Sequence, residues 1–148
     1  MLKEIVIEEN KGLKYLKDLF LLEKECFEEK AWEEAMLKEE LEKPYSICLL
    51  AKKENILMGY LLGRVIMDEG ELLRIAVKKA FRNKGIGSLL LKGFLERLKK
   101  LGIKKIFLEV EENNKRAYNL YTKFGFKPVN FRKEYYGNTS AVVMSCEI

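Results

Sequence analysis

The chain has 148 residues, 48% of them hydrophobic, with 10 glycines and 2 prolines, which fits one globular domain and excludes low-complexity disorder. It contains no histidine, which excludes serine–histidine triads, cysteine–histidine dyads and zinc sites with histidine ligands. Three cysteines without a CxxC pair argue against a disulfide framework and favour a reducing compartment. We therefore expect a cytoplasmic protein with a single domain over residues 1–148, without signal peptide, membrane span or metal.

The net charge of +5 is divided unevenly along the chain. Residues 1–70 contain 11 basic and 16 acidic side chains, a net charge of −5. Residues 71–148 contain 17 basic and 7 acidic side chains, a net charge of +10. Solvated helix faces would explain this asymmetry, as would an anionic ligand held by the second half and a cationic group met by the first.

Hydrophobic periodicity and turn residues predict a succession of strands and helices. In chain order these are a strand at 2–8, helices at 12–27 and 31–43, strands at 45–51, 56–67 and 71–77, a helix at 85–101, a strand at 104–110, a helix at 113–124, and strands at 126–132 and 141–148. An asparagine caps the last helix, and Gly102 and Gly125 end the last two. The order β-α-α-β-β-β-α-β-α-β-β predicts a mixed α/β domain.

A glycine loop with the pattern Arg82-x-x-Gly85-x-Gly87 stands between a predicted strand and a predicted helix. Glycines let a ligand approach the backbone, and the N–H groups at a helix N-terminus bind anions, so the loop suits a pyrophosphate. Arg82 and Lys84 add positive charge. The alternative is a glycine-rich helix start with solvated lysines. A dinucleotide fingerprint is excluded because its third glycine is replaced by Leu90, and no P-loop string occurs.

Further strings follow this loop in a fixed order. They are Ile75-Ala76-Val77, Arg82-x-x-Gly85-x-Gly87, Leu108-Glu109-Val110, Asn114, Ala117-x-x-x-Tyr121 and Gly125-Phe126. Together they resemble the acetyl-CoA-binding core of the GCN5-related N-acetyltransferase (GNAT) family, and within it the RimI type, which acetylates protein N-termini. The resemblance is weaker before Tyr60. It implies a GNAT fold and one N-acetyltransferase domain over the whole chain.

The resemblance also implies which residues bind acetyl-CoA. They are Ile75, Ala76, Val77, Arg82, Asn83, Lys84, Gly85, Ile86, Gly87, Ser88 and Asn114. The backbone from Ile75 to Val77 would pair with the pantetheine arm, and the pyrophosphate would lie on the helix that Gly85 opens. Residues implied to contact the substrate are Phe27, Arg74, Tyr135 and Tyr136.

Acetyl transfer to an amine needs a neutral amine, a stabilised oxyanion and a protonated leaving thiolate. Glu109 matches the general base of the resembled family, Tyr121 its general acid, and the Val77 amide is the expected oxyanion donor. Glu109 could instead be a strand carboxylate paired with a lysine, and Tyr121 a core aromatic. Tyr135 and Tyr136 could simply cover the sheet, and Phe27 could belong to the core.

At three places the chain departs from the family pattern, so side-chain specificity cannot be carried over from the family. Lys78-Lys79-Ala80 stands where Asp-Pro is common, Arg74 where asparagine is common, and Glu28 where proline is common. Between Glu23 and Glu42 there are nine acidic and three basic residues, which favours approach of a basic peptide.

The function expected from the sequence is acetylation of a protein N-terminus, with a ribosomal protein as target. The alternatives are a lysine or small-amine acetyltransferase, and an acetyl-CoA-binding domain without activity. A basic nucleic-acid-binding module is disfavoured because the basic and aromatic pattern of RNA-binding domains is missing. We expect a monomer or weak dimer.

Overall fold

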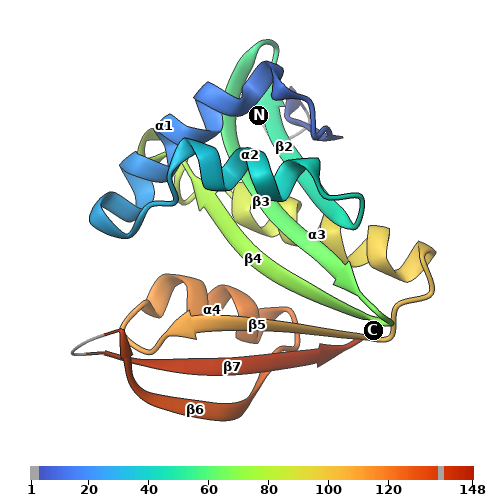
Figure 1. Cartoon of the computed structure of the whole chain (residues 1–148), viewed down its shortest axis with the longest axis vertical. Coiled ribbons are helices and arrows are strands. Elements are labelled where there is room, and N and C mark those ends of the chain that lie inside the picture. The colour runs from blue at the N-terminus through green and yellow to red at the C-terminus, as the bar shows by residue number, and fades with distance from the viewer. Residues whose placement is uncertain (1–3, 137–138) are drawn as a thin grey trace.

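The computed structural model describes residues 4–136 and 139–148, without the side chains of residues 134–136 and 139. Its centre is a seven-stranded sheet with the order β1-β2-β3-β4-β5-β7-β6 (Figure 1). Neighbouring strands are antiparallel except β4 and β5, which are parallel. Across these described ranges, no helix is long and apolar enough to cross a bilayer.

The elements follow the predicted order. The strands are β1 (Val6–Glu9), β2 (Ser46–Lys53), β3 (Ile56–Ile66), β4 (Glu69–Val77), β5 (Lys105–Glu111), β6 (Lys127–Tyr136) and β7 (Thr139–Glu147). The helices are α1 (Leu16–Phe27), α2 (Glu34–Glu42), α3 (Ile86–Lys100) and α4 (Lys115–Lys123), with short 3-10 turns η2 (Leu13–Tyr15), η3 (Glu28–Lys30) and η4 (Lys79–Phe81).

Several predicted boundaries were wrong, including the starts of the first two helices, which lie at Leu16 and Glu34. The first strand begins at Val6, and residues 2 and 3 of the predicted strand lie outside the described residues. The last two strands are longer than predicted, so the backbone of Tyr135 and Tyr136 belongs to β6 and not to the connecting turn. Pairing between β6 and β7 explains the extension, because the register continues past irregularities as far as Tyr136 and Thr139.

Alternating residues of the strands build two separate cores, one on each face of the sheet. On one face α1 and α2 bury Leu19, Leu37 and their neighbours against β2, β3 and β4. On the other face α3 and α4 pack against the remaining strand residues, with Phe94 fully buried. Burial on both faces explains why β2 reads as a continuous apolar run.

β4 and β5 separate as they leave their shared end of the sheet (Figure 1). Their parallel pairing covers only Gly70–Leu72 and Ile106–Leu108, although β4 continues to Val77 and β5 to Glu111. The outer halves of both strands therefore border a gap at their carboxyl ends. This is the edge at which open α/β sheets usually bind ligands.

Candidate active site

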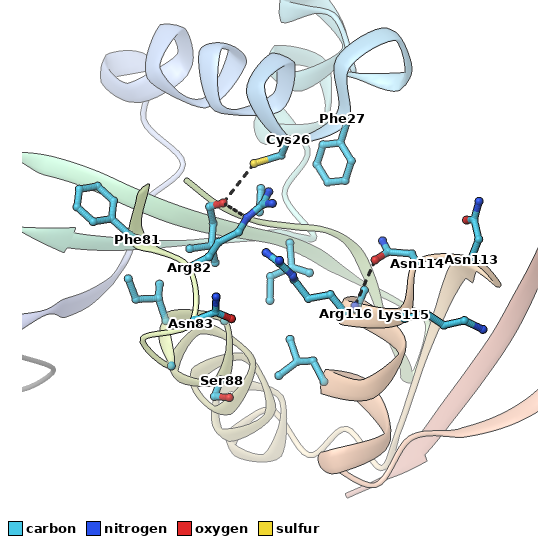
Figure 2. Close-up of a pocket in the computed structure, with 18 residues that line it drawn as sticks. Cys26, Phe27, Phe81, Arg82, Asn83, Ser88, Asn113, Asn114, Lys115 and Arg116 are labelled. Atoms are coloured by element: carbon cyan, nitrogen blue, oxygen red, sulfur yellow. Dashed lines mark hydrogen bonds between the residues drawn. The ribbon is translucent and has the colours of Figure 1, made fainter. Parts of the chain in front are cut away.

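A cavity of about 580 Å³ lies beside the carboxyl end of β4, between the starts of α3 and α4 (Figure 2). It is lined by Cys26, Phe27, Ile75, Ala76, Val77, Phe81, Arg82, Asn83, Gly85, Ile86, Gly87, Ser88, Asn113, Asn114, Lys115, Arg116, Ala117 and Leu120. All residues implied to bind acetyl-CoA are among these except Lys84. Lys84 lines a neighbouring hollow together with Ile5 and Met58.

The backbone of β4 presents hydrogen-bonding groups to the gap. The N–H of Lys78 donates to the carbonyl of Met58 over 2.9 Å, so this pair is hydrogen-bonded across β3 and β4. Antiparallel pairs alternate, so the next pair, Gly59 and Val77, does not exchange hydrogen bonds. The N–H groups of Val77 and, by the same alternation, Ile75 therefore point away from β3, towards the gap.

The N-terminus of α3 forms a second cluster of backbone donors. The first hydrogen bond within the helix is from the N–H of Leu89 to the carbonyl of Gly85, which leaves the three preceding N–H groups, those of Ile86, Gly87 and Ser88, without a partner inside the helix. Gly85 begins the helix in the left-handed region with φ 82°, and it provides no side-chain cap. A helix start of this kind binds an anion.

The charged side chains of the cavity have one sign. Arg82 reaches it from the loop before α3, and Lys115 and Arg116 from the first turn of α4. Among the described residues that line it, none is acidic. Together with the helix dipole, these cations make the cavity suitable for a phosphate-bearing ligand.

Hydrogen bonds fix the walls of the cavity. Arg82 Nε donates to the carbonyl oxygen of Val77 over 3.0 Å, and Cys26 Sγ donates to the same oxygen over 3.4 Å (Figure 2). Burial raises the pKa of the Cys26 thiol, so this cysteine remains a neutral donor near pH 7. Asn114 caps α4, because its side-chain oxygen accepts a hydrogen bond from the N–H of Ala117 over 3.3 Å.

Glu109 lies on β5 opposite to the core that α3 and α4 cover. Its neighbours Leu108 and Val110 point into that core, whereas Glu109 points to the face of α1 and α2. The side chain is 27% exposed, with Arg132 Nη1 3.7 Å from Oε1. That oxygen is buried, and within the described residues it has no hydrogen-bond partner. Oε1 forms an ion pair with Arg132 but accepts no hydrogen bond from the described residues, so its lone pairs are available to a proton.

Tyr121 lies on the other face, on α4, and is 6% exposed. Its ring packs against Phe126 at a centroid distance of 5.9 Å. Ala117, which stands one turn before Tyr121 on the same side of α4, lines the cavity. Burial raises the pKa of the phenol well above its usual range, while the charge of Arg74 acts in the opposite direction. Tyr121 is therefore protonated at neutral pH.

Two of the four expected substrate residues lie close together. The guanidinium carbon of Arg74 is 3.9 Å from the ring centre of Phe27. Arg74 is also paired with the buried Glu23, whose importance the sequence did not indicate. The side chains of Tyr135 and Tyr136 lie outside the described part of the structure.

Several cavity residues were not anticipated from the sequence. They are Cys26, Phe81, Asn113, Lys115, Arg116, Ala117 and Leu120. A signal existed for Lys115 and Arg116, because two cations directly after the predicted cap of a helix belong to its first turn. No comparable signal marks Cys26, which reaches the cavity from the end of α1.

Comparison with known proteins agrees with this geometry. Residues 14–126 match the model of the acetyltransferase (GNAT) family. An enzyme from Haemophilus influenzae named [ribosomal protein bS18]-alanine N-acetyltransferase is 36% identical over 64% of this chain and 67% of its own length. A Bacillus subtilis protein named as a candidate enzyme of the same kind is 31% identical over 86% of this chain and 84% of its own.

Solved structures show the same fold. The ribosomal-protein-S18-alanine N-acetyltransferase of Escherichia coli superimposes with a TM-score of 0.91, at 24% identity over 97% of this chain and 94% of that one. The PaiA N-acetyltransferase of Thermoplasma acidophilum, solved in complex with coenzyme A, superimposes with a TM-score of 0.82, at 24% identity over 97% of this chain and 99% of that one. The family match covers most of the chain, and the chain therefore belongs to the GNAT family of acetyltransferases.

Proposed function

We propose that this enzyme transfers the acetyl group of acetyl-CoA to the N-terminal α-amine of a protein, and that its target is a ribosomal protein of the S18 kind. Two relatives with names of this kind support the target. The observation that carries the proposal is the N–H of Val77, which points into the gap next to the N-terminus of α3. Such a target would place the enzyme in the cytoplasm.

The residues of the cavity fit acetyl-CoA. The N–H groups at the start of α3, with Arg82 beside them, would hold the pyrophosphate. The exposed backbone edge from Ile75 to Val77 would pair with the amides of the pantetheine arm, as an added strand would. Acetyl-CoA, when bound, supplies an acetyl group on a thioester, whose leaving thiolate is stabilised by protonation.

The two proposed catalytic groups lie on opposite faces of the sheet, Glu109 on β5 and Tyr121 on α4. Glu109 faces the side of α1 and α2, so it would accept the proton of an amine that arrives from that side, directly or through a water. Val77 would donate its N–H to the carbonyl oxygen as negative charge develops there. Tyr121, on the side of α3 and α4, would give its proton to the leaving sulfur.

The chemistry of the acceptor favours an α-amine. An α-amino group has a pKa of about 7.7–8.0, so a substantial minority is neutral at pH 7.4. A lysine with a pKa of about 10.4 is neutral in about one molecule in a thousand. The carboxylate of Glu109 would therefore need to remove a proton from an α-amine less often than from a lysine before the amine can attack.

A direct test is to incubate the protein with acetyl-CoA and a library of peptides that differ at their first two residues, and to locate the added acetyl group by mass spectrometry. We expect acetylation of the α-amine, fastest on a small first residue such as alanine or serine. Acetylation of internal lysines alone would favour the lysine acetyltransferase alternative. Binding of acetyl-CoA without any turnover would favour a domain that only binds it.

A further inference from the structure

The carboxylate of Glu23 is fully buried, with 0% exposure, and donors from three residues surround it. Oε1 accepts hydrogen bonds from Arg74 Nη2 over 2.9 Å and from the N–H of Trp32 over 2.8 Å. Oε2 accepts from Arg74 Nε over 3.2 Å and from the hydroxyl of Tyr60. A buried carboxylate is tolerated only when its oxygens are satisfied in this way. Through these bonds Glu23, on α1, is linked to Tyr60 on β3, to Arg74 on β4 and to Trp32 just before α2.

Arg74 makes further contacts, and they fall on one segment of the chain. Its guanidinium carbon is 3.9 Å from the ring centre of Phe27 and 5.4 Å from that of Trp32. Its Nη2 also donates to the carbonyl of Lys30 over 2.9 Å. The planar fork of an arginine allows the paired bonds to Glu23 and the stacking on aromatic rings together, which a lysine cannot reproduce.

This segment, Phe27–Trp32, connects α1 to α2, and little within the segment itself fixes its conformation. Glu28 leaves α1 with φ 52°, in the left-handed region that non-glycine residues rarely adopt. None of the residues of η3 is buried. The segment is tied to β4 through Arg74, and Lys30 forms an ion pair with Glu111 at the end of β5. It therefore bridges the two strands that border the gap.

We propose that Arg74 is a positioning residue for the acetyl acceptor, because its pairing with Glu23 holds Phe27–Trp32 across the gap and forms one wall of the acceptor groove before the acceptor binds. This inference rests on the proposed function, in which the amine arrives from the face of α1 and α2. The geometry supports it, because the segment is held to β4 through Arg74 and to β5 through the Lys30–Glu111 ion pair. Glu111 lies on the same face of β5 as Glu109, the face from which the amine would arrive.

The test compares Arg74→Lys and Arg74→Gln with the wild type. We expect the KM for an acceptor peptide to rise by about tenfold or more, equivalent to about 1.4 kcal/mol, while the Kd for acetyl-CoA changes by less than about twofold. Trypsin should also cleave faster after Lys30, because the loosened segment becomes accessible to the protease. If Arg74→Gln fails to fold, Glu23→Gln weakens the same ion pair while keeping the shape of the side chain, and it should change the peptide KM and the cleavage rate in the same direction.

Arg64→Lys is the matched control. Arg64 lies on β3, is partly buried like Arg74, and pairs with Glu40 and Glu71. The Arg64→Lys substitution should change neither the peptide KM nor the rate of cleavage after Lys30, because both partners of Arg64 lie outside Phe27–Trp32. An unchanged peptide KM and cleavage rate in Arg74→Lys would overturn the inference, as would an equal loss of acetyl-CoA affinity. If the wild type acetylates no peptide, the proposed function fails, while the cleavage rate still decides whether Arg74 holds the segment.

Discussion

Arg82 Nε donates a hydrogen bond to the carbonyl oxygen of Val77 over 3.0 Å, and this bond ties the loop before α3 to the end of β4. This bond therefore fixes the distance between two groups of backbone donors in the cavity, the N–H of Val77 and the N–H groups at the start of α3. Arg82 thus contributes a hydrogen bond that orders the site and a positive charge that would face the phosphates of acetyl-CoA.

Arg82→Ala should weaken acetyl-CoA binding by about tenfold or more, because both the charge and the hydrogen bond are lost, each worth about 1 kcal/mol or more. Calorimetric titration measures the effect. Lys84→Ala is the matched control, since Lys84 belongs to the same loop but lines the neighbouring hollow. An equal loss in both variants would show that only the net charge of the loop matters.

Gly87→Val should abolish acetyl-CoA binding. A Cβ at Gly87 would lie 3.4 Å from Leu120 Cδ2 and 3.9 Å from Val77 Cγ2, so the branched side chain would occupy the space between α3 and α4. Acetyl-CoA at 100 times its Kd should stabilise the wild type by about 2.7 kcal/mol and the variant not at all. Gly93→Ala, in the same helix but facing Ile7 and Leu49, should retain the stabilisation. A folded Gly87→Val protein with unchanged affinity would refute the assignment of the site.

Glu109→Gln and Tyr121→Phe should each reduce turnover by about 10²–10⁴-fold, the usual contribution of a general base or acid. Their acetyl-CoA affinity should change much less, because both groups are proposed to act on the reacting atoms and not on the phosphates or the pantetheine arm. Steady-state kinetics with a peptide substrate measures the effect. Tyr118→Phe, on the same helix, should remain active. Full activity in both Glu109→Gln and Tyr121→Phe would show that other residues perform these steps.

Stability should fall at alkaline pH. Burial raises the pKa of the Cys48 thiol to about 12 and holds the pKa values of the Tyr60 and Tyr121 phenols well above their usual range. In the unfolded chain thiols ionise near pH ~8.5 and phenols near pH ~10. Above these values the folded state binds more protons than the unfolded state, so the free energy of unfolding decreases as pH rises.

Urea denaturation at a series of pH values measures this dependence. Cys48→Ala should lower the slope between about pH 9 and 10 by about 1.4 kcal/mol per pH unit, because the variant has no thiol to ionise at this position. Its stability at neutral pH will also be lower, since it loses buried sulfur, but that loss does not depend on pH. The same alkaline slope in variant and wild type would contradict the buried thiol as the cause.

The order of elements could be predicted from the sequence because the signals were local. Gly102 and Gly125 end their helices with φ values of 81° and 94°, as their positions after apolar periodic segments indicate. The glycine loop lies between a strand and a helix as its sequence indicates, and it lines the cavity. Resemblance to the GNAT family added the expected roles of Asn114 and Tyr121, which no local pattern indicates.

The features that could not be predicted depend on contacts between distant segments. Glu23 looks like one more charge on an acidic helix, and only the packing of α1 against β3 and β4 shows that it is buried and paired with Arg74. The separation of β4 and β5 after Leu72 depends on the pairing register, which composition does not determine. The position of Cys26 at the cavity likewise depends on how the end of α1 packs against β4, which the sequence does not show.

A basic peptide should be the better substrate. The segment from Glu23 to Glu42 contains nine acidic residues against three basic ones, and several of its carboxylates, including those of Glu28 and Glu29, are exposed. A negative rim accelerates the approach of a cationic partner more than it strengthens the final complex. We expect kcat/KM for a peptide with lysine or arginine after its first residues to fall as salt rises. A neutral peptide of matched length should show little salt dependence, and equal dependence for both would contradict the role of the rim.

The most direct test of the proposed function uses one peptide in two forms. In the first form the α-amine is free and the lysines are blocked, and in the second the α-amine is blocked and the lysines are free. The initial rate of acetyl transfer from acetyl-CoA is measured for both by mass spectrometry at about pH 7.4. We predict rapid acetylation of the first form and little of the second, because Glu109 meets an amine that is often neutral already. Faster acetylation of the second form would contradict the proposed function and identify the protein as a lysine acetyltransferase.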